Sequence, residues 1–154
     1  MRIKIRYIVL TFFCIYSIFF FLGGTLAPLM AKLGYYDFSS ELYFIYFHSC
    51  HQQPDRSFWL VGYPVALCCR CYGFYLGVII FSILALFNKL KINLKVFSIL
   101  AMISLIDIYI NYGLGMRLNT GNYTRFFVGI VMGLLFTTVI CYILKIEWRK
   151  KYEN

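Results

Sequence analysis

Long apolar runs separated by short polar segments make up most of the chain. Four runs approach the roughly 20 residues that a transmembrane helix needs, and they cover residues 7–27, 71–88, 96–116 and 126–144. They lack the apolar–polar alternation of a barrel strand, and within lipid only helices and closed barrels satisfy every backbone amide. The pattern predicts an all-α integral membrane protein, a four-helix bundle formed by a single domain over residues 1–154.

The composition indicates lipid rather than water as the main solvent. Hydrophobic residues make up 62% of the chain and charged residues only 14%, whereas soluble domains carry about 25% charged residues. This excludes a soluble domain, a disordered chain and a secreted disulfide scaffold. The first run exceeds the roughly 7–15 apolar residues of a signal peptide, and Leu26-Ala27-Pro28 is a weak cleavage context, so we expect this run to be retained as the first span.

The formal net charge of +9 reflects the order of the predicted spans. Ten basic residues flank the spans on one side, namely Arg2, Lys4, Arg6, Lys89, Lys91, Lys95, Lys145, Arg149, Lys150 and Lys151. Five lie on the other side, namely Lys32, Arg56, Arg70, Arg117 and Arg125. Because Lys and Arg are enriched in cytoplasmic loops, we expect a multi-pass protein of the cell membrane with both termini cytoplasmic. The partner of these charges is then the lipid bilayer, and no soluble basic face remains for nucleic acid.

The first extracytoplasmic loop, residues 32–70, is the one long connection between predicted spans. An aromatic run over 42–47 follows Ser40 and Glu41, residues that favour the start of a helix. Tyr and Phe are enriched at the level of lipid headgroups. We therefore expect a short interfacial helix from Ser40 to His51, ended by Pro54.

Groups able to bind metal or do redox chemistry are concentrated in this loop. Both histidines and four of the six cysteines lie between His48 and Cys71. Cys14 and Cys141 lie in the middle of predicted spans, where a thiol behaves as a small hydrophobic group. The sequence therefore predicts that any chemistry occurs at the extracytoplasmic face.

One interpretation is a metal site formed by Cys50, His51, Cys68 and Cys71, with His48 as a substitute ligand. Two cysteines separated by two residues, with a further cysteine and a histidine, are typical ligands of zinc or another thiophilic ion. Four protein ligands make a closed, structural site. With one ligand missing, an open position could activate water, so the sequence leaves open whether the protein is an enzyme.

A second interpretation is a membrane thiol–disulfide oxidoreductase that uses Cys68 and Cys71, linked to a quinone and to a thiol or small-molecule partner outside the cell. The layout is similar to that of disulfide-generating quinone reductases, which have four membrane helices and such a cysteine pair at the start of the second. The second outer loop of this chain lacks their further cysteine pair, and Cys50 would have to replace it. A third interpretation is that the cysteines are purely structural.

Polar residues near the cysteines suggest a shell around the site or an adjoining pocket. They are Arg56, Arg70, Asp107, Asn122 and Arg125, with Arg117 in the same outer loop. A charge next to lipid needs a partner, and acids inside spans are candidates for function. The alternatives are a buried Asp–Arg pair that fixes helix registry, or a pocket in which Asp107 takes up a proton or Arg125 holds an anionic headgroup, quinone or substrate.

A combination of motifs extends over residues 48–133. The positions are Cys50-His51-Gln52-x-Pro54-x-Arg56-Ser57-Phe58, then Cys68-x-Arg70-Cys71-x-Gly73-x-Tyr75-x-Gly77, then Asp107 and Asn122-x-x-Arg125-x-x-x-Gly129-x-x-x-Gly133. This combination resembles an uncharacterised family of prokaryotic membrane proteins, domain of unknown function 2085. The resemblance implies a small polytopic membrane protein and supplies no reaction. Cys69 departs from the pattern, which leads us to expect a small residue such as alanine there.

Overall fold

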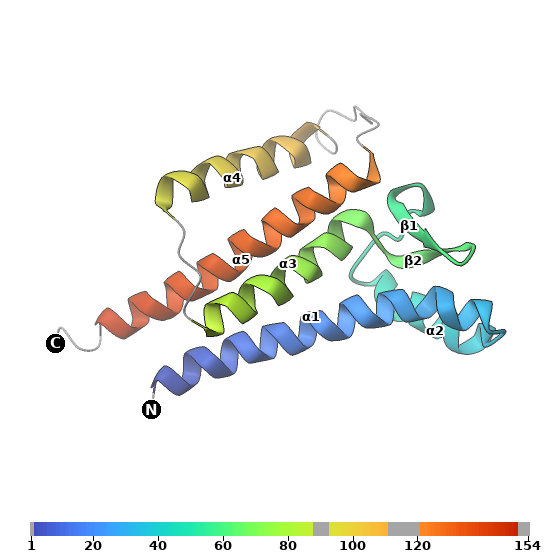
Figure 1. The fold of residues 1–154 in the computed structure, drawn as a ribbon, viewed down its shortest axis with the longest axis horizontal. Helices are drawn as coiled ribbons and strands as arrows, with labels where there is room; N and C mark the ends of the chain where they lie inside the picture. The colour runs from blue at the N-terminus through green and yellow to red at the C-terminus, as the bar shows by residue number, and fades with distance from the viewer. Residues whose placement is uncertain (1, 88–92, 111–120, 151–154) are drawn as a thin grey trace.

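The computed structural model describes residues 2–87, 93–110 and 121–150, and these are mostly helical (Figure 1). The elements are α1 (Arg2–Lys32), α2 (Tyr36–Phe47), a 3-10 turn (Pro54–Arg56), β1 (Ser57–Leu60), β2 (Tyr63–Cys68), α3 (Cys69–Leu86), α4 (Leu94–Ile108) and α5 (Asn122–Lys150). The long helices lie side by side, with both termini at one end of the bundle and with α2 and the hairpin at the other (Figure 1).

Among the described residues, three helices are long and apolar enough to cross a membrane: Ile5–Lys32, Cys69–Leu86 and Asn122–Leu144. They correspond to the predicted spans 7–27, 71–88 and 126–144. Predicted span 96–116 corresponds in part to α4, which has 15 residues, and its last part lies outside the described residues. The number of spans therefore stays a prediction beyond these three.

Burial in the bundle is the reverse of that in a soluble protein. Large apolar side chains such as Ile8, Phe12 and Met102 are 61–65% exposed, whereas Ser17 and Thr137 are buried. Both Thr137 and the half-buried Thr138 donate a hydrogen bond to a carbonyl oxygen of their own helix. A surface of this kind suits contact with lipid tails.

Four glycines bring α3 and α5 into backbone contact. A Cβ on Gly73 would lie 2.1 Å from the Phe126 carbonyl oxygen, and one on Gly129 would lie 2.1 Å from that of Arg70. Gly77 and Gly133 make the equivalent contacts one turn further along, at 2.5 and 2.6 Å from backbone oxygens. Small residues four apart permit this close approach in membranes, so the first turns of the two helices are fixed against each other.

The helix in the first loop begins earlier than predicted, at Tyr36 instead of Ser40, and ends at Phe47 instead of His51. Gly34, at φ +88°, ends α1 with the paired hydrogen bonds of a Schellman motif, since its amide bonds to Ala31 and that of Tyr35 to Met30. The reversal starts α2 at once. Its first turns then pack on α1, where the Ser39 hydroxyl donates to the Ala27 oxygen at 2.8 Å.

A two-stranded antiparallel hairpin occupies residues that the sequence analysis left without structure. Strands β1 and β2 pair Ser57 with Cys68 and Leu60 with Tyr63. The turn consists of Val61 and Gly62, with φ values of 51° and 93°, so both central residues have the left-handed backbone of the tightest hairpin turns. The hairpin delivers Cys68 directly to the start of α3.

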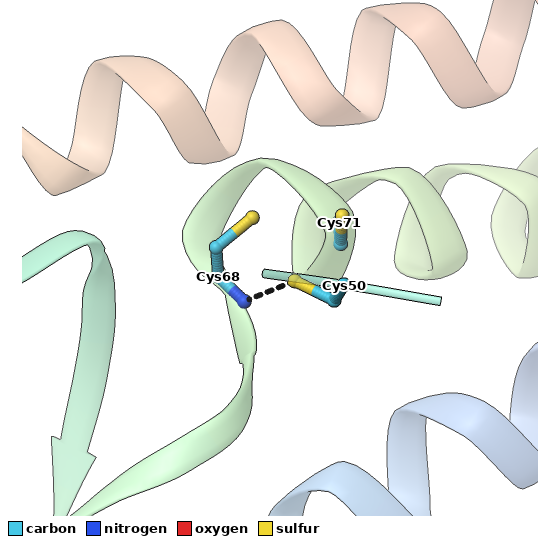
Figure 2. A group of neighbouring side chains, drawn as sticks. All are labelled: Cys50, Cys68 and Cys71. Atoms are coloured by element: carbon cyan, nitrogen blue, oxygen red, sulfur yellow. Dashed lines mark hydrogen bonds between the residues drawn. The ribbon is translucent and has the colours of Figure 1, made fainter. Parts of the chain in front are cut away.

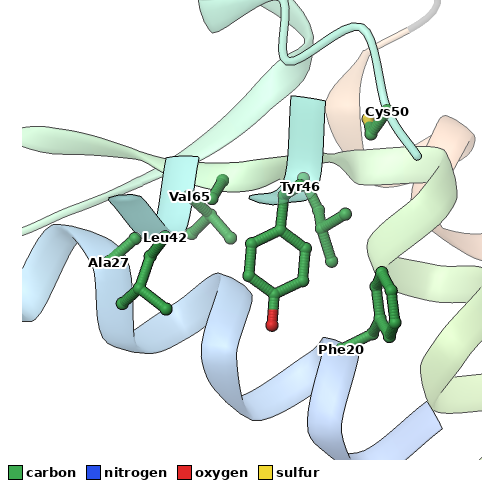
Figure 3. Packing of buried hydrophobic residues seen from close by; sticks show 8 residues of the cluster. Phe20, Ala27, Leu42, Tyr46, Cys50 and Val65 are labelled. Atoms are coloured by element: carbon green, nitrogen blue, oxygen red, sulfur yellow. The ribbon is translucent and has the colours of Figure 1, made fainter. Parts of the chain in front are cut away.

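A small apolar core lies where α1, α2 and β2 meet (Figure 3). Its members are Phe20, Ala27, Leu42, Tyr46, Cys50, Val65, Ala66 and Leu67. Tyr46 is fully buried, and its hydroxyl donates to the Phe19 oxygen of α1 at 3.1 Å. This core holds α2 and the hairpin against α1, beside the cysteines.

Candidate functional site

Three cysteine side chains converge at the amino-terminal end of α3. The Sγ atoms of Cys50, Cys68 and Cys71 lie within 4.8 Å of one another, and Figure 2 shows them around the first turn of that helix. Cys50 is 4% exposed, and the other two are half-buried. The three belong to three elements: the segment after α2, the end of β2, and α3.

Cys50 is held by the carboxyl end of α2 and by Gln52. The Tyr46 carbonyl oxygen accepts from the amides of both Ser49 and Cys50, the latter at 2.9 Å. The Gln52 amide group donates to the Tyr43 oxygen at 2.7 Å and to the Ala66 oxygen at 3.0 Å. Gln52 thus joins α2 to β2 across the turn that carries Cys50.

Cys68 and Cys71 are placed by the change from strand to helix. Cys68 is the last residue of β2 and the N-cap of α3, so Cys71 follows within the first helical turn. The Cys68 amide donates to the Cys50 sulfur at 3.1 Å (Figure 2). The positive end of the α3 dipole faces the group and favours thiolates there.

Hydrogen bonds among the thiols favour one thiolate at Cys68. Those from Cys50 and then from Cys71 hold the pKa of Cys68 well below its usual range, and they outweigh its burial. The pKa of Cys50 is raised, first because its thiol donates to Cys68. The three sulfurs therefore resemble one thiolate that accepts hydrogen bonds from two thiols. Its negative charge would attract a cation.

The structure leaves both imidazoles outside the group of sulfurs. His51 follows Cys50 but is exposed. His48 is also exposed, and its Nδ1 lies 3.3 Å from the Phe44 oxygen of α2. Cys69, next to the group in sequence, is fully buried and is not part of it.

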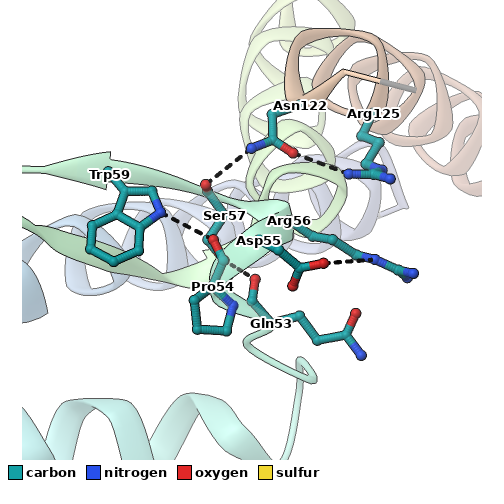
Figure 4. Close-up of polar contacts among 8 residues, drawn as sticks. All are labelled: Gln53, Pro54, Asp55, Arg56, Ser57, Trp59, Asn122 and Arg125. Atoms are coloured by element: carbon teal, nitrogen blue, oxygen red, sulfur yellow. Dashed lines mark hydrogen bonds and ion pairs between the residues drawn. The ribbon is translucent and has the colours of Figure 1, made fainter. Parts of the chain in front are cut away.

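The predicted polar residues divide into two arrangements. Arg70 of α3 and Asp107 of α4 form an ion pair of 2.5 Å, with side chains only 13% and 12% exposed. Arg56, Asn122 and Arg125 lie at the hairpin end (Figure 4). There Asn122 donates to the Ser57 oxygen at 3.2 Å and accepts from Arg125 at 3.1 Å. Arg117 lies outside the described residues.

Gln52 belongs to the first sequence motif, but its structural role was not predicted. Its side chain, not the neighbouring histidine, fixes the loop that carries Cys50. Its backbone φ of 47° lies where residues other than glycine are uncommon. Two glutamines, Gln52 and Gln53, stand between the cysteine motifs. The sequence does not tell which of them donates to backbone carbonyl oxygens.

Comparisons with known proteins identify the family of the chain. The family model described as "Predicted membrane protein (DUF2085)" matches residues 50–139, which include the three cysteines and the glycines of α3 and α5. An uncharacterized protein of Methanocaldococcus jannaschii is 36% identical over 144 residues, which cover 88% of this chain and 90% of that protein. No solved structure matches. On both matches, the chain belongs to the DUF2085 family of predicted membrane proteins.

Proposed function

We propose that Cys50, Cys68 and Cys71 bind one thiophilic metal ion, zinc or an ion of similar preference, at the extracytoplasmic end of the membrane bundle. The observation that carries the proposal is the separation of their sulfurs, at most 4.8 Å. Zinc–sulfur bonds of about 2.3 Å in a tetrahedron place sulfurs about 3.8 Å apart. A small inward movement of three side chains would therefore complete the geometry.

Charge also supports a cation at this place. Loading a divalent ion replaces the remaining thiol protons, so three thiolates and the ion carry a net charge of −1. The amide of Cys68 donates to the Cys50 sulfur, and hydrogen bonds of this kind stabilise thiolate ligands. The start of α3 adds a favourable dipole.

His51 is the proposed fourth ligand, with His48 as its substitute. His51 follows Cys50 directly, and its ring is exposed, so rotation towards the sulfurs meets little packing. Four protein ligands make a closed site that supports structure. The metal would then join the loop after α2 to the hairpin and α3, and the proposal assigns no reaction to it.

We further propose four spans, with α4 continuing over residues 96–116 and both termini cytoplasmic. The two ends of the chain lie at the same end of the bundle (Figure 1). The ten basic residues predicted on one side of the membrane would accompany them. The cysteines would then face the outside of the cell membrane.

Metal analysis of the detergent-purified full chain tests the metal site. After reconstitution with zinc we expect about one equivalent, reduced at least tenfold by Cys50→Ala, Cys68→Ala or Cys71→Ala. Cys69→Ala is the matched control, since its thiol is adjacent but outside the group, and it should retain the metal. Absence of metal from the unaltered chain, or equal loss in the control, would refute the site.

His51→Ala separates the fourth ligand from the other three. Under the proposal it weakens zinc binding at least tenfold in a competition with a chelator but leaves the limiting stoichiometry at one. An unchanged affinity in His51→Ala and His48→Ala would show that no histidine contributes, and the fourth position would be open to an external ligand.

The position of Cys50 also supports a second candidate, a thiol–disulfide oxidoreductase. A third thiol beside Cys68 and Cys71 supplies the missing partner for thiol exchange. Oxidation of two thiols to a disulfide would release two electrons and two protons, which reduce a quinone to a hydroquinone. Alkylation trapping of the metal-free protein, with and without quinone, distinguishes the two functions, since a metal site gives no quinone-dependent disulfide.

A further inference from the structure

Acidic residues cannot account for all the buried arginines at the hairpin end. The chain has six acids, Asp37, Glu41, Asp55, Asp107, Glu147 and Glu153. Asp37 and Glu41 are exposed on α2, and Asp107 is paired with Arg70. Glu147 is on α5 about 38 Å along the helix axis from its start, and Glu153 is outside the described residues. Asp55 remains, and its ion pair in the described part of the chain is with Arg56.

Arg125 is buried with a neutral partner. It is 8% exposed, and its Nη1 donates to the Asn122 side-chain oxygen at 3.1 Å. No carboxylate oxygen of the described residues lies within 4.0 Å of it. Residues 111–120, which precede α5, contain no acid in their sequence. A guanidinium stays charged at any physiological pH, so its burial requires an anion.

Arg56 is the second arginine drawn at the hairpin end (Figure 4), and it is poorly neutralised. Its side chain is 15% exposed, and its Nε lies 3.9 Å from Asp55, whose side chain is 74% exposed. Arg56 directly precedes Ser57, whose carbonyl oxygen accepts from Asn122. One peptide unit and one amide side chain thus link the two arginines, and both guanidinium groups extend towards the same side in Figure 4.

The start of α5 adds to the positive potential. Asn122 is its first residue, and its first turn contains no acid. Helix starts carry a partial positive charge and unpaired amides, so a cation such as Arg125 is unfavourable there by itself. An anion would interact favourably with both guanidinium groups and with the helix start.

We propose that Arg56 and Arg125 bind a phosphate group at the outer end of the bundle. Two planar guanidinium groups match the oxygens of a phosphate. In a membrane the phosphate would come from a lipid headgroup or from a soluble phosphate compound, and the same residues would bind either. Arg125 is near enough to Cys69 to act on its thiol electrostatically, but the site uses none of the three sulfurs of the proposed metal site and does not rest on the metal.

Native mass spectrometry of the detergent-purified full chain tests the proposal. One arm adds phosphatidylglycerol, and the other adds inorganic phosphate. We expect one bound molecule of either probe, with at least tenfold weaker binding in Arg56→Gln and in Arg125→Gln. Lys32→Gln is the matched control, since Lys32 is an exposed cation at the same end of the bundle, and its binding should change less than twofold.

The outcomes distinguish the two sources of the phosphate group and include results that overturn the proposal. Binding of phosphatidylglycerol alone identifies a lipid headgroup, and comparable binding of inorganic phosphate identifies a soluble phosphate. Arg125→Lys retains the charge and serves if Arg125→Gln fails to fold, and it should still weaken binding severalfold because it loses the planar fork. No binding of either probe, or equal binding in the arginine variants and the control, overturns the proposal. The proposal is also overturned if the arginine variants lose zinc while their phosphate binding is unchanged. The arginines would then balance the negative charge of the metal–thiolate site.

Discussion

Replacing Gly129 by alanine tests how the first turn of α3 is fixed. The added methyl group would lie 2.1 Å from the Arg70 carbonyl oxygen and 2.9 Å from the Phe74 nitrogen. Both are backbone atoms of α3, so no side-chain rotation relieves the contact. The two helices must move apart, and the movement is imposed beside Cys71.

The size of the effect follows from that distance. A carbon needs about 3.3 Å from a carbonyl oxygen, so α3 must move by about 1.2 Å. Overpacking of this kind costs about 1–3 kcal/mol, and rigid backbone on both sides favours the upper end of that range. Alanine returns about 1 kcal/mol through its higher helix propensity. We expect a net loss of about 2 kcal/mol in the free energy of unfolding, close to a thirtyfold change in the equilibrium.

Equilibrium unfolding in mixed micelles, followed by circular dichroism, measures this free energy. Gly121→Ala is the matched control, because no atom in the described part of the chain lies within 4 Å of a Cβ built at that position. The free energy of unfolding of the control should equal that of the unaltered protein to within about 0.5 kcal/mol. A metal competition on the same samples should show weaker binding for Gly129→Ala only, since its helix shift moves Cys71 relative to Cys50.

The double variant gives the sharper test. A Cβ on Gly73 meets the Phe126 oxygen at 2.1 Å, so Gly73→Ala forces the same separation from the other helix. Once the helices are apart, the second methyl group adds little, and the losses should fall short of additive by about 1 kcal/mol or more. Additive losses, or a Gly129→Ala protein as stable as Gly121→Ala, would show that these helices are not in backbone contact.

Three further substitutions test the segments around the cysteines. Val61→Asn should stabilise the protein by about 1 kcal/mol in the same unfolding assay. The φ of Val61 is 51°, where a β-branched residue is strained and asparagine is not. A less stable variant would show that the turn does not have this backbone conformation. Gln52→Glu should lower the free energy of unfolding by about 2–3 kcal/mol and reduce the amount of bound zinc. The two hydrogen bonds that the amide donates become repulsive contacts between a carboxylate and carbonyl oxygens. The exposed neighbour Gln53→Glu should change neither quantity, and equal effects would remove the assigned role of Gln52. Tyr46→Phe should cost about 1 kcal/mol through the lost hydrogen bond to Phe19 with zinc stoichiometry unchanged, and metal loss there would mean that the hydroxyl positions Cys50.

The membrane helices were predictable because lipid imposes a simple requirement on sequence. Long uncharged runs located Ile5–Lys32, Cys69–Leu86 and Asn122–Leu144 to within a few residues. Boundaries were less accurate, since hydropathy does not detect caps. Helix α3 begins at Cys69, two residues before the predicted span, because it follows directly on β2, which ends at Cys68.

The outer loop was harder to predict because its helix and hairpin depend on local backbone geometry. Ser40 and Glu41 indicated a helix start, yet Gly34 had already reversed the chain, and the preceding Ser39 bonds to α1. The hairpin turn uses Val61 where asparagine is usual, so its signal is weak. The clustering of cysteines in the sequence predicted that Cys50 would lie near Cys68 and Cys71, as it does. The clustering could not show that the neighbouring His51 is exposed and lies outside the group of sulfurs.

Arg70 connects the cysteine group to the membrane bundle. It lies between Cys68 and Cys71, its carbonyl oxygen packs on Gly129 of α5, and its guanidinium pairs with Asp107 of α4. The first turn of α3 is therefore held from two helices without any metal, whereas Cys50 is held by α2 and Gln52. A metal ion would join these two independently supported parts, so its removal should loosen the outer loop while the contact between α3 and α5 persists.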